Sequence, residues 1–503
     1  MRFARVASRA QLGLDAPPIW VEVHLTPGLP AVNVVGMAES TVREAKERVR
    51  SAIISSGFKW PDSRITINLS PAELPKVGAR FDLAIAVGLL AASGQIKPDA
   101  VDGKEFYGEL GLDGRLLGCK GLLSAVVAAT QEEQPIVLPE ATVQTLPYVS
   151  GSQLHPLNTL ADLSKTALPT VTITATNRQS GEFGGENRPA NSEQLSDQLM
   201  AQPMMTRTLA IAAAGGHHLL LSGEPGTGKT LSASTLPLLL PALTDDERLQ
   251  IQIIRDIAGL APTDKRPFRA PHHSASLAGL IGGTSRALPG EITLAHCGVL
   301  FLDELPEFKR EVLETLRQPL ESGEVTVARA GITHSYPACF QLIAAMNPCP
   351  CGYLTSTTTN CRCSATAIQR YQSRLSGPLM DRFDLHATVN RIDTVLILKR
   401  RGAQVDIHAL QQETAQARRR QLQRQGVLNT ELSSNALEKV CQLDDGDVDW
   451  LAKAANGLKL SARTVHRSMR VARTIADLSG ETRVSRQALA EALSFRPASH
   501  SGT

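Results

Sequence analysis

The amino-acid sequence predicts an α/β protein in which a phosphate-binding core lies between an N-terminal α/β domain and a C-terminal all-α lid. Three features carry this prediction: a glycine-rich motif between a strand and a helix, a second apolar strand that ends in two acids, and helical periodicity near the C-terminus. We expect an N-terminal domain over residues 1–165, a linker over 166–200, the core over 201–395 and the lid over 396–503.

Composition and charge limit the classes of function. The 503 residues carry a net charge of only +3, so any contact with nucleic acid must come from a local basic surface. Aromatic residues make up 4% of the chain, which argues against a base-stacking platform. The N-terminus is polar, and no apolar run reaches the roughly 18 residues of a membrane helix. We therefore expect a cytoplasmic protein with no signal peptide and no membrane partner.

Short apolar runs alternate with helical patterns in the N-terminal domain. The expected strands are Trp20–Leu25, Ala31–Val35 and Arg64–Leu69, and the expected helices are Thr41–Ser56 and Arg80–Ser93. This alternation indicates an α/β layer domain. Residues 166–200 are polar and rich in Gly, Asn and Ser, which is typical of a linker.

Two stretches of this domain, PKVGARFDL from Pro75 and GELGLDGRLLGCKGLLSA from Gly108, resemble the Lon-protease-type fold. In that family a serine and a lysine form the nucleophilic dyad. The matching positions here are Arg80 and Leu123, which cannot perform that chemistry. We interpret the domain as a non-proteolytic relative, with an unrelated α/β domain as the alternative. Lys76, Arg80 and Asp82 are then expected to be surface or subunit-interface charges.

A phosphate loop follows the apolar run Leu219–Leu221. Its eight residues, with the spacing G-x-x-x-x-G-K-[ST], are Gly223, Glu224, Pro225, Gly226, Thr227, Gly228, Lys229 and Thr230. Glycines let consecutive backbone N–H groups turn inward around a phosphate. The lysine supplies a cation for the β- and γ-phosphates, and the threonine hydroxyl is a Mg²⁺ ligand. The motif therefore predicts binding of ATP with Mg²⁺, which Thr230 ligates.

A second strand about 75 residues later ends in two acids. Residues 298–304 read GVLFLDE, so Asp303 and Glu304 stand at the carboxyl end of a buried parallel strand. At this distance from a phosphate loop the pattern indicates a Walker B motif. Asp303 is expected to hold Mg²⁺ through water, and Glu304 to orient or deprotonate the attacking water.

Two further features surround this strand. Before it, the loop with His272 and His273 is interpreted as conformational or DNA-facing, because adjacent side chains on a strand point to opposite faces and do not form a metal pair. After it, Glu324–Tyr336 alternates about a glycine turn and predicts a hairpin with Arg329 near its tip, a candidate DNA contact. The next strand ends at Asn347.

Four cysteines follow that strand in two close pairs: Cys349, Cys351, Cys361 and Cys363. Four thiolates with this grouping match a tetrahedral soft-ligand site. We predict a Zn²⁺ site that stabilises a loop without a core of its own. Four free thiols or a redox pair are the alternatives.

Five stretches together carry a resemblance that covers nearly the whole chain: FRAPHHSAS, GEITLAHCGVLFLDELPEF, LRQPLESGEVTVARA, AAMNPCPCGY and LSGPLMDRFDL. They closely resemble the ComM/YifB group of magnesium-chelatase-like AAA+ proteins. The resemblance implies a hexamer with ATP sites between subunits, a hairpin that faces the pore, and branch migration on DNA during recombination of incoming strands.

The resemblance also implies roles for three polar residues. Asn347 corresponds to the first sensor, which polarises the attacking water. Arg382 occupies the position of the arginine finger that a neighbouring subunit supplies, because its planar fork suits the γ-phosphoryl oxygens. Arg463 corresponds to the second sensor, which touches the γ-phosphate of its own subunit. A local salt bridge for Arg382 and a solvated helix position for Arg463 are the alternatives.

The C-terminal region is expected to be helical. The predicted helices are Leu410–Gln425, Ser434–Leu443, Asp447–Ala455, Ala462–Ser479 and Ser485–Leu493. The arginines of the first of these helices, at positions 418, 419, 420 and 424, are expected to form a solvated face, since a helix distributes adjacent residues around its circumference.

The motifs predict a Mg²⁺-dependent ATPase, and the resemblance implies that it is a hexameric AAA+ motor that acts on single-stranded or branched DNA. Two alternatives belong to other classes. One is the motor subunit of a metal chelatase, and the other is a protein-remodelling ATPase paired with a peptidase.

Overall fold

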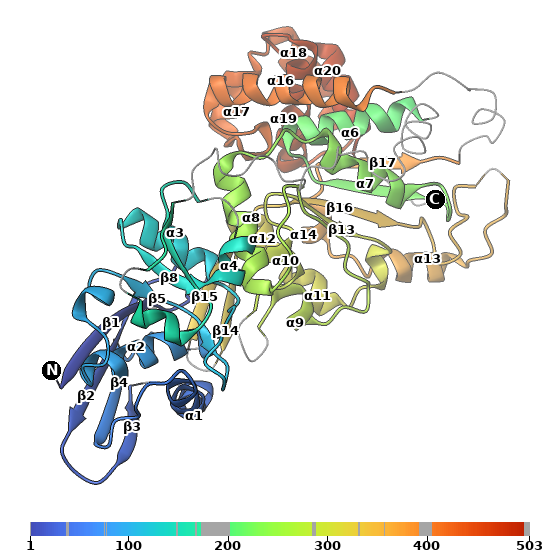
Figure 1. Ribbon diagram of the computed structural model, residues 1–503. Helices are drawn as coiled ribbons and strands as arrows, with labels where there is room; N and C mark the ends of the chain where they lie inside the picture. Colours follow the sequence, from blue (N-terminus) through green and yellow to red (C-terminus); the bar gives the residue numbers. More distant parts are fainter. Residues whose placement is uncertain are drawn as a thin grey trace.

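The computed structural model describes residues 2–36, 40–74, 76, 78–146, 149–165, 168–172, 202–283, 288–329, 332–356, 358–391 and 405–496. Figure 1 shows three regions in sequence order: the N-terminal region at the lower left, the sheet of the core in the centre, and a group of helices above that sheet. Most of the linker predicted over 166–200 lies outside the described residues. Within it, Val171–Thr172 forms β10, which pairs with β9.

The N-terminal region contains a mixed eight-stranded sheet with the order β10-β9-β8-β5-β1-β2-β4-β3. Its other strands are β1 (Phe3–Arg9), β2 (Pro18–Thr26), β3 (Ala31–Val35), β4 (Arg64–Ser70), β5 (Glu105–Phe106), β8 (Ile136–Pro139) and β9 (Gln153–Leu157). A separate ribbon consists of β6 (Glu109–Leu110) and β7 (Leu116–Leu117), and the helices are α1 (Ser40–Ser55), α2 (Asp82–Ala92), α3 (Leu123–Gln131) and α4 (Glu140–Thr145). The predicted α/β layer is therefore present, whereas its likeness to the Lon-type fold stays a prediction.

The expectation that Lys76, Arg80 and Asp82 lie at a surface is wrong, because all three are buried. Each finds a partner inside the fold, as buried charges require. The Lys76 ammonium donates to the Pro71 carbonyl, and Arg80 Nη2 donates to the carbonyls of residues 120 and 121, both at 2.9 Å. Asp82 accepts from Arg48 Nε at 2.9 Å, yet burial raises the pKa of its carboxyl to about 6.

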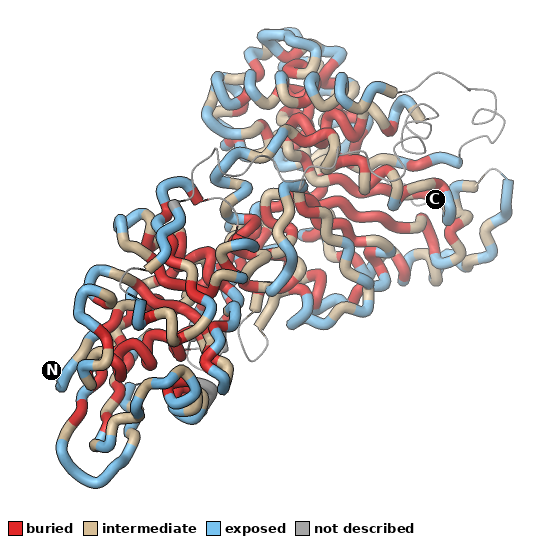
Figure 2. The backbone as a smooth tube through the Cα atoms, in the orientation of Figure 1, coloured by how far each residue is buried: buried red, intermediate tan, exposed pale blue. Residues whose placement is uncertain are grey.

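The core is built on a five-stranded sheet in which every neighbouring pair is parallel, with the order β12-β13-β16-β11-β17. The strands are β11 (Leu219–Gly223), β12 (Phe268–Arg269), β13 (Val299–Leu302), β16 (Gln341–Met346) and β17 (Leu385–Val389). All residues of β13 and β16 are buried, as a sheet covered on both faces requires, and Figure 2 shows these strands as a continuous buried layer.

The helices and the hairpin of the core surround this sheet. The helices are α6 (Pro203–Gly215), α7 (Lys229–Leu239), α8 (Asp245–Ala258), α9 (Leu277–Ile281), α10 (Glu291–Leu294), α11 (Arg310–Thr315), α12 (Arg317–Ser322), α13 (Ala365–Gln372) and α14 (Gly377–Met380), and the hairpin pairs β14 (Glu324–Arg329) with β15 (Ile332–Pro337). The sequence pattern suggests one helix over 309–321, but the structure breaks it at Leu316, close to Pro319, which has no N–H to donate.

The C-terminal region is helical, as predicted. Its helices are α16 (Ile407–Gln425), α17 (Ser434–Cys441), α18 (Asp445–Gly457), α19 (Ala462–Ser479) and α20 (Arg486–Ser494). Buried His217, just before β11, joins this region to the core, since its ring nitrogens lie 3.0 Å from Asp384 Oδ2 and 2.8 Å from Thr474 Oγ1. None of the described helices is both long and apolar enough to cross a membrane.

The solvated arginine face expected on α16 is wrong for three of its four arginines, and one of these, Arg420, donates through Nη1 to the Asp477 carbonyl of α19 at 2.6 Å. Arg418 Nε donates to the Ala213 carbonyl of α6 at 2.8 Å, and burial lowers the pKa of its guanidinium to about 10. Arg424 pairs with the buried Asp477 of α19 at 2.6 Å. These arginines bind neighbouring helices, which a helical pattern alone does not reveal.

The N-terminal region and the core share one apolar cluster, in which residues of α3 lie with Ile253 and Ile257 of α8. At the same contact, Asp256 Oδ2 accepts a hydrogen bond of 2.8 Å from the backbone N–H of Leu123 at the start of α3. An acid at a helix N-terminus satisfies orphan N–H groups and interacts favourably with the helix dipole. Asp256 of the core therefore caps a helix of the N-terminal region.

We expect Asp256→Ala to lower the free energy of unfolding by about 1 kcal/mol, because the first N–H groups of α3 lose their acceptor. Urea denaturation followed by circular dichroism measures this loss. Asp256→Asn keeps a side-chain carbonyl acceptor and serves as the matched control, so it should lose less. Equal stability of the alanine variant and the unsubstituted chain would show that the cap contributes nothing to the contact between the two regions.

Candidate functional site

The parallel sheet brings the predicted phosphate loop and the two acids of β13 to the same edge. The loop follows β11 at its carboxyl end and leads into α7, which begins at Lys229. Gly226 and Gly228 have φ of 76° and 87°, the left-handed region that glycine adopts without steric cost. Open α/β sheets bind ligands at this edge, so the fold places the loop where phosphate recognition is expected.

The side chains of this edge converge. The Lys229 ammonium donates to the carbonyls of Gly223 and Glu224, each at 2.8 Å, and to Asn347 Oδ1 at 3.0 Å. Thr230 Oγ1 donates to Asp303 Oδ2 at 2.8 Å. Burial lowers the pKa of Lys229, and the nearby carboxylates oppose that shift. A phosphate cradle, a lysine, and a hydroxyl beside a carboxylate are the groups that ATP and Mg²⁺ require, so these residues fit both.

Glu304 adopts an unusual backbone conformation at this edge. Its φ is 53°, in the left-handed region that non-glycine residues rarely enter, and its backbone N–H donates to Asp303 Oδ1 at 2.9 Å. Such strain occurs often at functional sites. The Glu304 carboxylate contacts His273, with Oε2 lying 3.2 Å from Nδ1. Sequence reasoning assigned His273 only to a loop and did not anticipate this contact.

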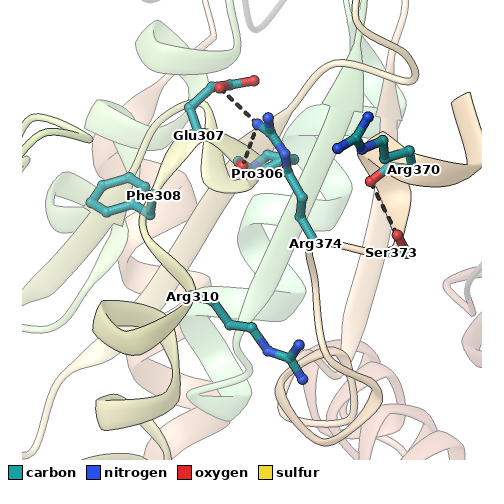
Figure 3. Close-up of a pocket in the computed structure, with 7 residues that line it drawn as sticks. All are labelled: Pro306, Glu307, Phe308, Arg310, Arg370, Ser373 and Arg374. Carbon is teal, nitrogen blue, oxygen red and sulfur yellow. Dashed lines mark hydrogen bonds and ion pairs between the residues drawn. The ribbon is translucent and has the colours of Figure 1, made fainter. Parts of the chain in front are cut away.

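Beside the two acids lies an open basic cleft of about 520 Å³. Pro306, Glu307, Phe308, Arg310, Arg370, Ser373 and Arg374 line it, and Figure 3 shows how they are arranged. Arg374 Nη1 donates to Glu307 at 2.8 Å and to the Pro306 carbonyl at 3.1 Å, which ties the segment after α13 to the turn after β13. No sequence motif marks this cleft, because Arg310 and Arg370 come from segments 60 residues apart.

The predicted cysteine cluster is assembled in space. The sulfur atoms of Cys349, Cys351, Cys361 and Cys363 all lie within 4.8 Å of one another. Three of the sulfur–sulfur distances are 3.4, 3.5 and 3.7 Å. A tetrahedron with Zn–S bonds of about 2.3 Å needs separations of roughly 3.8 Å, so the donor set fits a zinc ion.

Backbone groups also act on one thiol of this cluster. The N–H groups of Tyr353 and Arg362 lower the pKa of the Cys351 thiol to about 6. The loop lies against the phosphate loop as well, because a methyl group placed on Gly352 would come within 2.5 Å of Pro225 Cδ. The cysteine loop therefore supports one wall of the phosphate loop.

Arg382 and Arg463 lie at the opposite edge of the sheet. The N–H groups of Asp384 and Leu385 donate to the His218 carbonyl at 3.1 Å, which fixes this segment before the start of β11, whereas Lys229 follows its end. With a rise of about 3.3 Å per residue, the five residues of β11 separate the two edges by roughly 13–17 Å.

The arginines form a cluster at that edge. Arg463 Nη1 lies 3.8 Å from Asp381 Oδ2, and the buried Arg467 pairs with Asp381 at 3.1 Å. The Arg382 guanidinium contacts Glu321 of α12. Burial lowers the pKa of this guanidinium, and nearby Arg463, Arg317 and Arg467 lower it further.

This placement contradicts the expectation that Arg463 touches a γ-phosphate in its own subunit. Arg463 sits with Arg382 and far from Lys229, because α19 packs against the segment that enters β17. The position of Arg382 is compatible with its expected role, since an arginine finger serves the site of another chain. Arg467, which sequence reasoning passed over, holds the segment by donating to the Phe383 carbonyl at 2.9 Å.

Models of three known protein families together match most of the chain. The family described as magnesium chelatase, subunit ChlI, matches residues 196–396. The family described as subunit ChlI of Mg-chelatase matches residues 21–142, and its C-terminal counterpart matches 406–496. The chain is 44% identical to competence protein ComM of Haemophilus influenzae over 506 residues, which cover 99% of this chain and 98% of that protein.

The chain belongs to the ComM/YifB family of magnesium-chelatase-like AAA+ ATPases. YifB of Escherichia coli is 42% identical over 500 residues, which cover 99% of this chain and 97% of that protein. A weaker match links the chain to the magnesium-chelatase 38 kDa subunit of Acidiphilium rubrum, at 27% identity over 30% of this chain and 51% of that protein.

In this ComM/YifB-family protein, the insert between β12 and β13 lies against the hairpin. A methyl group on Gly283, in the insert between β12 and β13, would lie 3.2 Å from Val327 Cγ1 of β14. β14 ends at Arg329, which pairs with Ile332 across the hairpin turn. The side chain of Arg329 lies outside the described part of the chain, so its contact with DNA stays a prediction.

Proposed function

We propose that this ComM/YifB-family ATPase is a ring motor, most simply a hexamer, that hydrolyses ATP with Mg²⁺ and moves single-stranded or branched DNA. One observation carries the proposal: the residues suited to bind ATP and the arginines suited to complete its hydrolysis lie at opposite edges of one sheet. One chain therefore contains two halves of different ATP sites. A ring joins each half to its complement on the neighbouring chain.

The roles of the residues follow from their chemistry. Lys229 and the phosphate loop bind the phosphates, and Thr230 and Asp303 would hold Mg²⁺. Glu304 activates the attacking water, and Asn347, which lies 3.0 Å from the Lys229 ammonium, polarises it. Arg382 of the neighbouring chain stabilises the charge of the transferred phosphoryl group. We assign Arg463 to the same neighbouring chain, since both arginines share one edge.

The proposal of DNA as substrate rests on the relative and on the hairpin. The relative with 44% identity is named a competence protein. Contact between the insert and β14 gives a paired loop surface that is suited to grip a strand in a pore. We therefore propose branch migration during recombination as the activity.

We also propose that the four clustered cysteines hold one Zn²⁺ ion. The ion would replace the thiol protons and fix the loop that packs on Pro225. Its contribution is structural, because all four ligand positions are filled by protein sulfur.

DNA should stimulate ATP hydrolysis, and salt should suppress the stimulation. Phosphate contacts release counterions, so we expect the affinity for DNA to fall at least about tenfold between ~50 and ~200 mM salt. The measurement is the ATPase rate with and without single-stranded and four-way-junction DNA at both salt concentrations. Robust hydrolysis without any response to DNA would leave the nucleotide site standing and move the substrate to a protein or, as in a chelatase, to a macrocycle.

Arg382→Ala should lower kcat by about 10³-fold while nucleotide binding is kept, as expected for an arginine finger. Lys229→Ala should abolish nucleotide binding. Each variant alone is inactive, but a mixture contains interfaces with an intact Lys229 on one side and an intact Arg382 on the other. Recovery of ATPase activity in the mixture tests the role in trans, and absence of recovery in mixed rings that assemble would refute it.

Cys351→Ser should remove the bound metal and weaken ATP binding several-fold, because the loop that supports the phosphate loop loses its cross-link. Elemental analysis measures zinc per chain, and fluorescent-nucleotide titration measures affinity. Cys441→Ser, a buried cysteine of α17 outside the cluster, is the matched control and should retain zinc. A protein purified under metal-replete conditions that carries no zinc would refute the site.

A further inference from the structure

The basic cleft beside the two acids keeps an excess of positive charge. Its lining contains three arginines and one glutamate, which leaves a net charge of about +2 at neutral pH. Arg374 is paired with Glu307 at 2.8 Å. Arg310 and Arg370 are both exposed, and within the described part of the chain neither guanidinium takes part in an ion pair. Two cations of the cleft are therefore available to an anion.

The walls of this cleft follow the two strands that carry the residues proposed to act on water. On one side, the backbone N–H of Glu307 donates to the Glu304 carbonyl at 2.8 Å, so the wall begins directly after the proposed catalytic acid. On the other side, α13 is docked at the end of β16, because Gln372 Nε2 donates to the Pro348 carbonyl at 3.2 Å. Pro348 follows Asn347 in sequence. The cleft therefore lies close to both polar strand ends.

A buried tyrosine lies between the cleft and these strand ends. Tyr371 follows Arg370 on α13, and its side chain is buried. Burial, together with the nearby Glu307 carboxylate, raises the pKa of its hydroxyl to about 12, whereas a hydrogen bond with the backbone of Asn347 opposes this shift. The hydroxyl is therefore neutral at physiological pH and reaches Asn347. The cleft and the proposed site of hydrolysis share this uncharged wall.

The chemistry of the cleft suits inorganic phosphate. The planar fork of an arginine matches two phosphate oxygens, and Arg310 of α11 and Arg370 of α13 approach the cleft from different segments (Figure 3). Inorganic phosphate is in large part a dianion at neutral pH, so it complements the net charge of the cleft. A carboxylate from a neighbouring chain or a single phosphodiester of DNA brings only one negative charge.

We propose that this cleft binds the inorganic phosphate that ATP hydrolysis releases, with Arg310 and Arg370 as its main ligands, and that phosphate leaves the nucleotide site through it. Attack of water on ATP yields ADP, inorganic phosphate and a proton. A basic cleft next to the reacting groups attracts the anion away from ADP, which prevents the two products from recombining. The inference rests on the proposed function for the source of the phosphate, but its binding is measurable without hydrolysis and without DNA.

The first test is a calorimetric titration of inorganic phosphate into the full chain saturated with ADP and Mg²⁺. Because ADP fills the phosphate loop, we expect one further phosphate to bind per chain. Arg310→Ala and Arg370→Ala should each weaken this binding about tenfold, since each removes a charge-assisted contact. Lys309→Ala is the matched control, because it removes a positive charge from an exposed neighbour that does not line the cleft, and it should bind phosphate normally.

The second test follows phosphate during a single turnover of ATP. Rapid quenching measures cleavage, and a fluorescent phosphate reporter measures release. Arg370→Ala should leave the rate of cleavage unchanged and slow the release of phosphate about fivefold, because the anion is no longer attracted to the cleft. Phosphate that stays longer beside ADP undergoes more reversals of cleavage, so it should also gain more ¹⁸O from labelled water.

Four results would overturn the inference. Equal phosphate binding by all variants would place the anion in the nucleotide site, and equal weakening by Lys309→Ala would reduce the effect to general surface charge. Normal phosphate binding by the arginine variants with loss of DNA affinity or of assembly would make the cleft a surface for DNA or for a neighbouring chain. Binding that depends on the arginines without any change in release would exclude the exit role. Arginine-dependent binding and release in a protein that ignores DNA would uphold the cleft and refute DNA as the substrate.

Discussion

The parallel alignment of β11, β16 and β13 is the constraint on which the rest of this protein depends. Parallel strands end at a common edge, so the residues that follow them meet without any need for sequence proximity. Lys229, Asp303 and Asn347 come together for this reason. Packing of the buried apolar strands fixes the register between them, and this register sets the positions of the polar residues that follow each strand. The chemistry of the site is thus a consequence of how the sheet is packed.

The same alignment places the two arginines of the predicted ATP site away from the phosphate loop. Arg382 and Arg463 stand where β17 begins, at the edge that is remote from the phosphate loop. In the proposed motor, an ATP site completed by Arg382 draws on two chains, and hydrolysis requires assembly. The contact of Arg382 with Glu321 and the pairing of Arg467 with Asp381 hold this cluster of like charges together within one chain. Membership of the ComM/YifB family identifies the chain as an AAA+ ATPase.

Several contacts make the core responsive to its surroundings. The cysteine loop lies against Pro225, and Asp256 caps helix α3 of the N-terminal region. The insert contacts Glu304 through His273. Each contact joins the nucleotide-binding sheet to a segment that sequence places elsewhere. The strained φ of Glu304 adds to this picture, because a residue held in an unfavourable conformation depends on its neighbours to stay there. These contacts link the nucleotide-binding sheet to the cysteine loop, the N-terminal region and the insert.

The sequence by itself determined the local elements and the motifs. β3 and α19 have the predicted bounds, and the phosphate loop, the acids after β13 and the cysteine pairs are all recognisable, because each depends on spacing within a short stretch. Only the tertiary structure decided which side chains meet across the chain. It buried Lys76, Arg80 and Asp82, moved Arg463 away from the phosphate loop, and joined His273 to Glu304. Periodicity and motif spacing describe neighbours along the backbone, whereas these contacts arise from packing between segments, which no local pattern encodes.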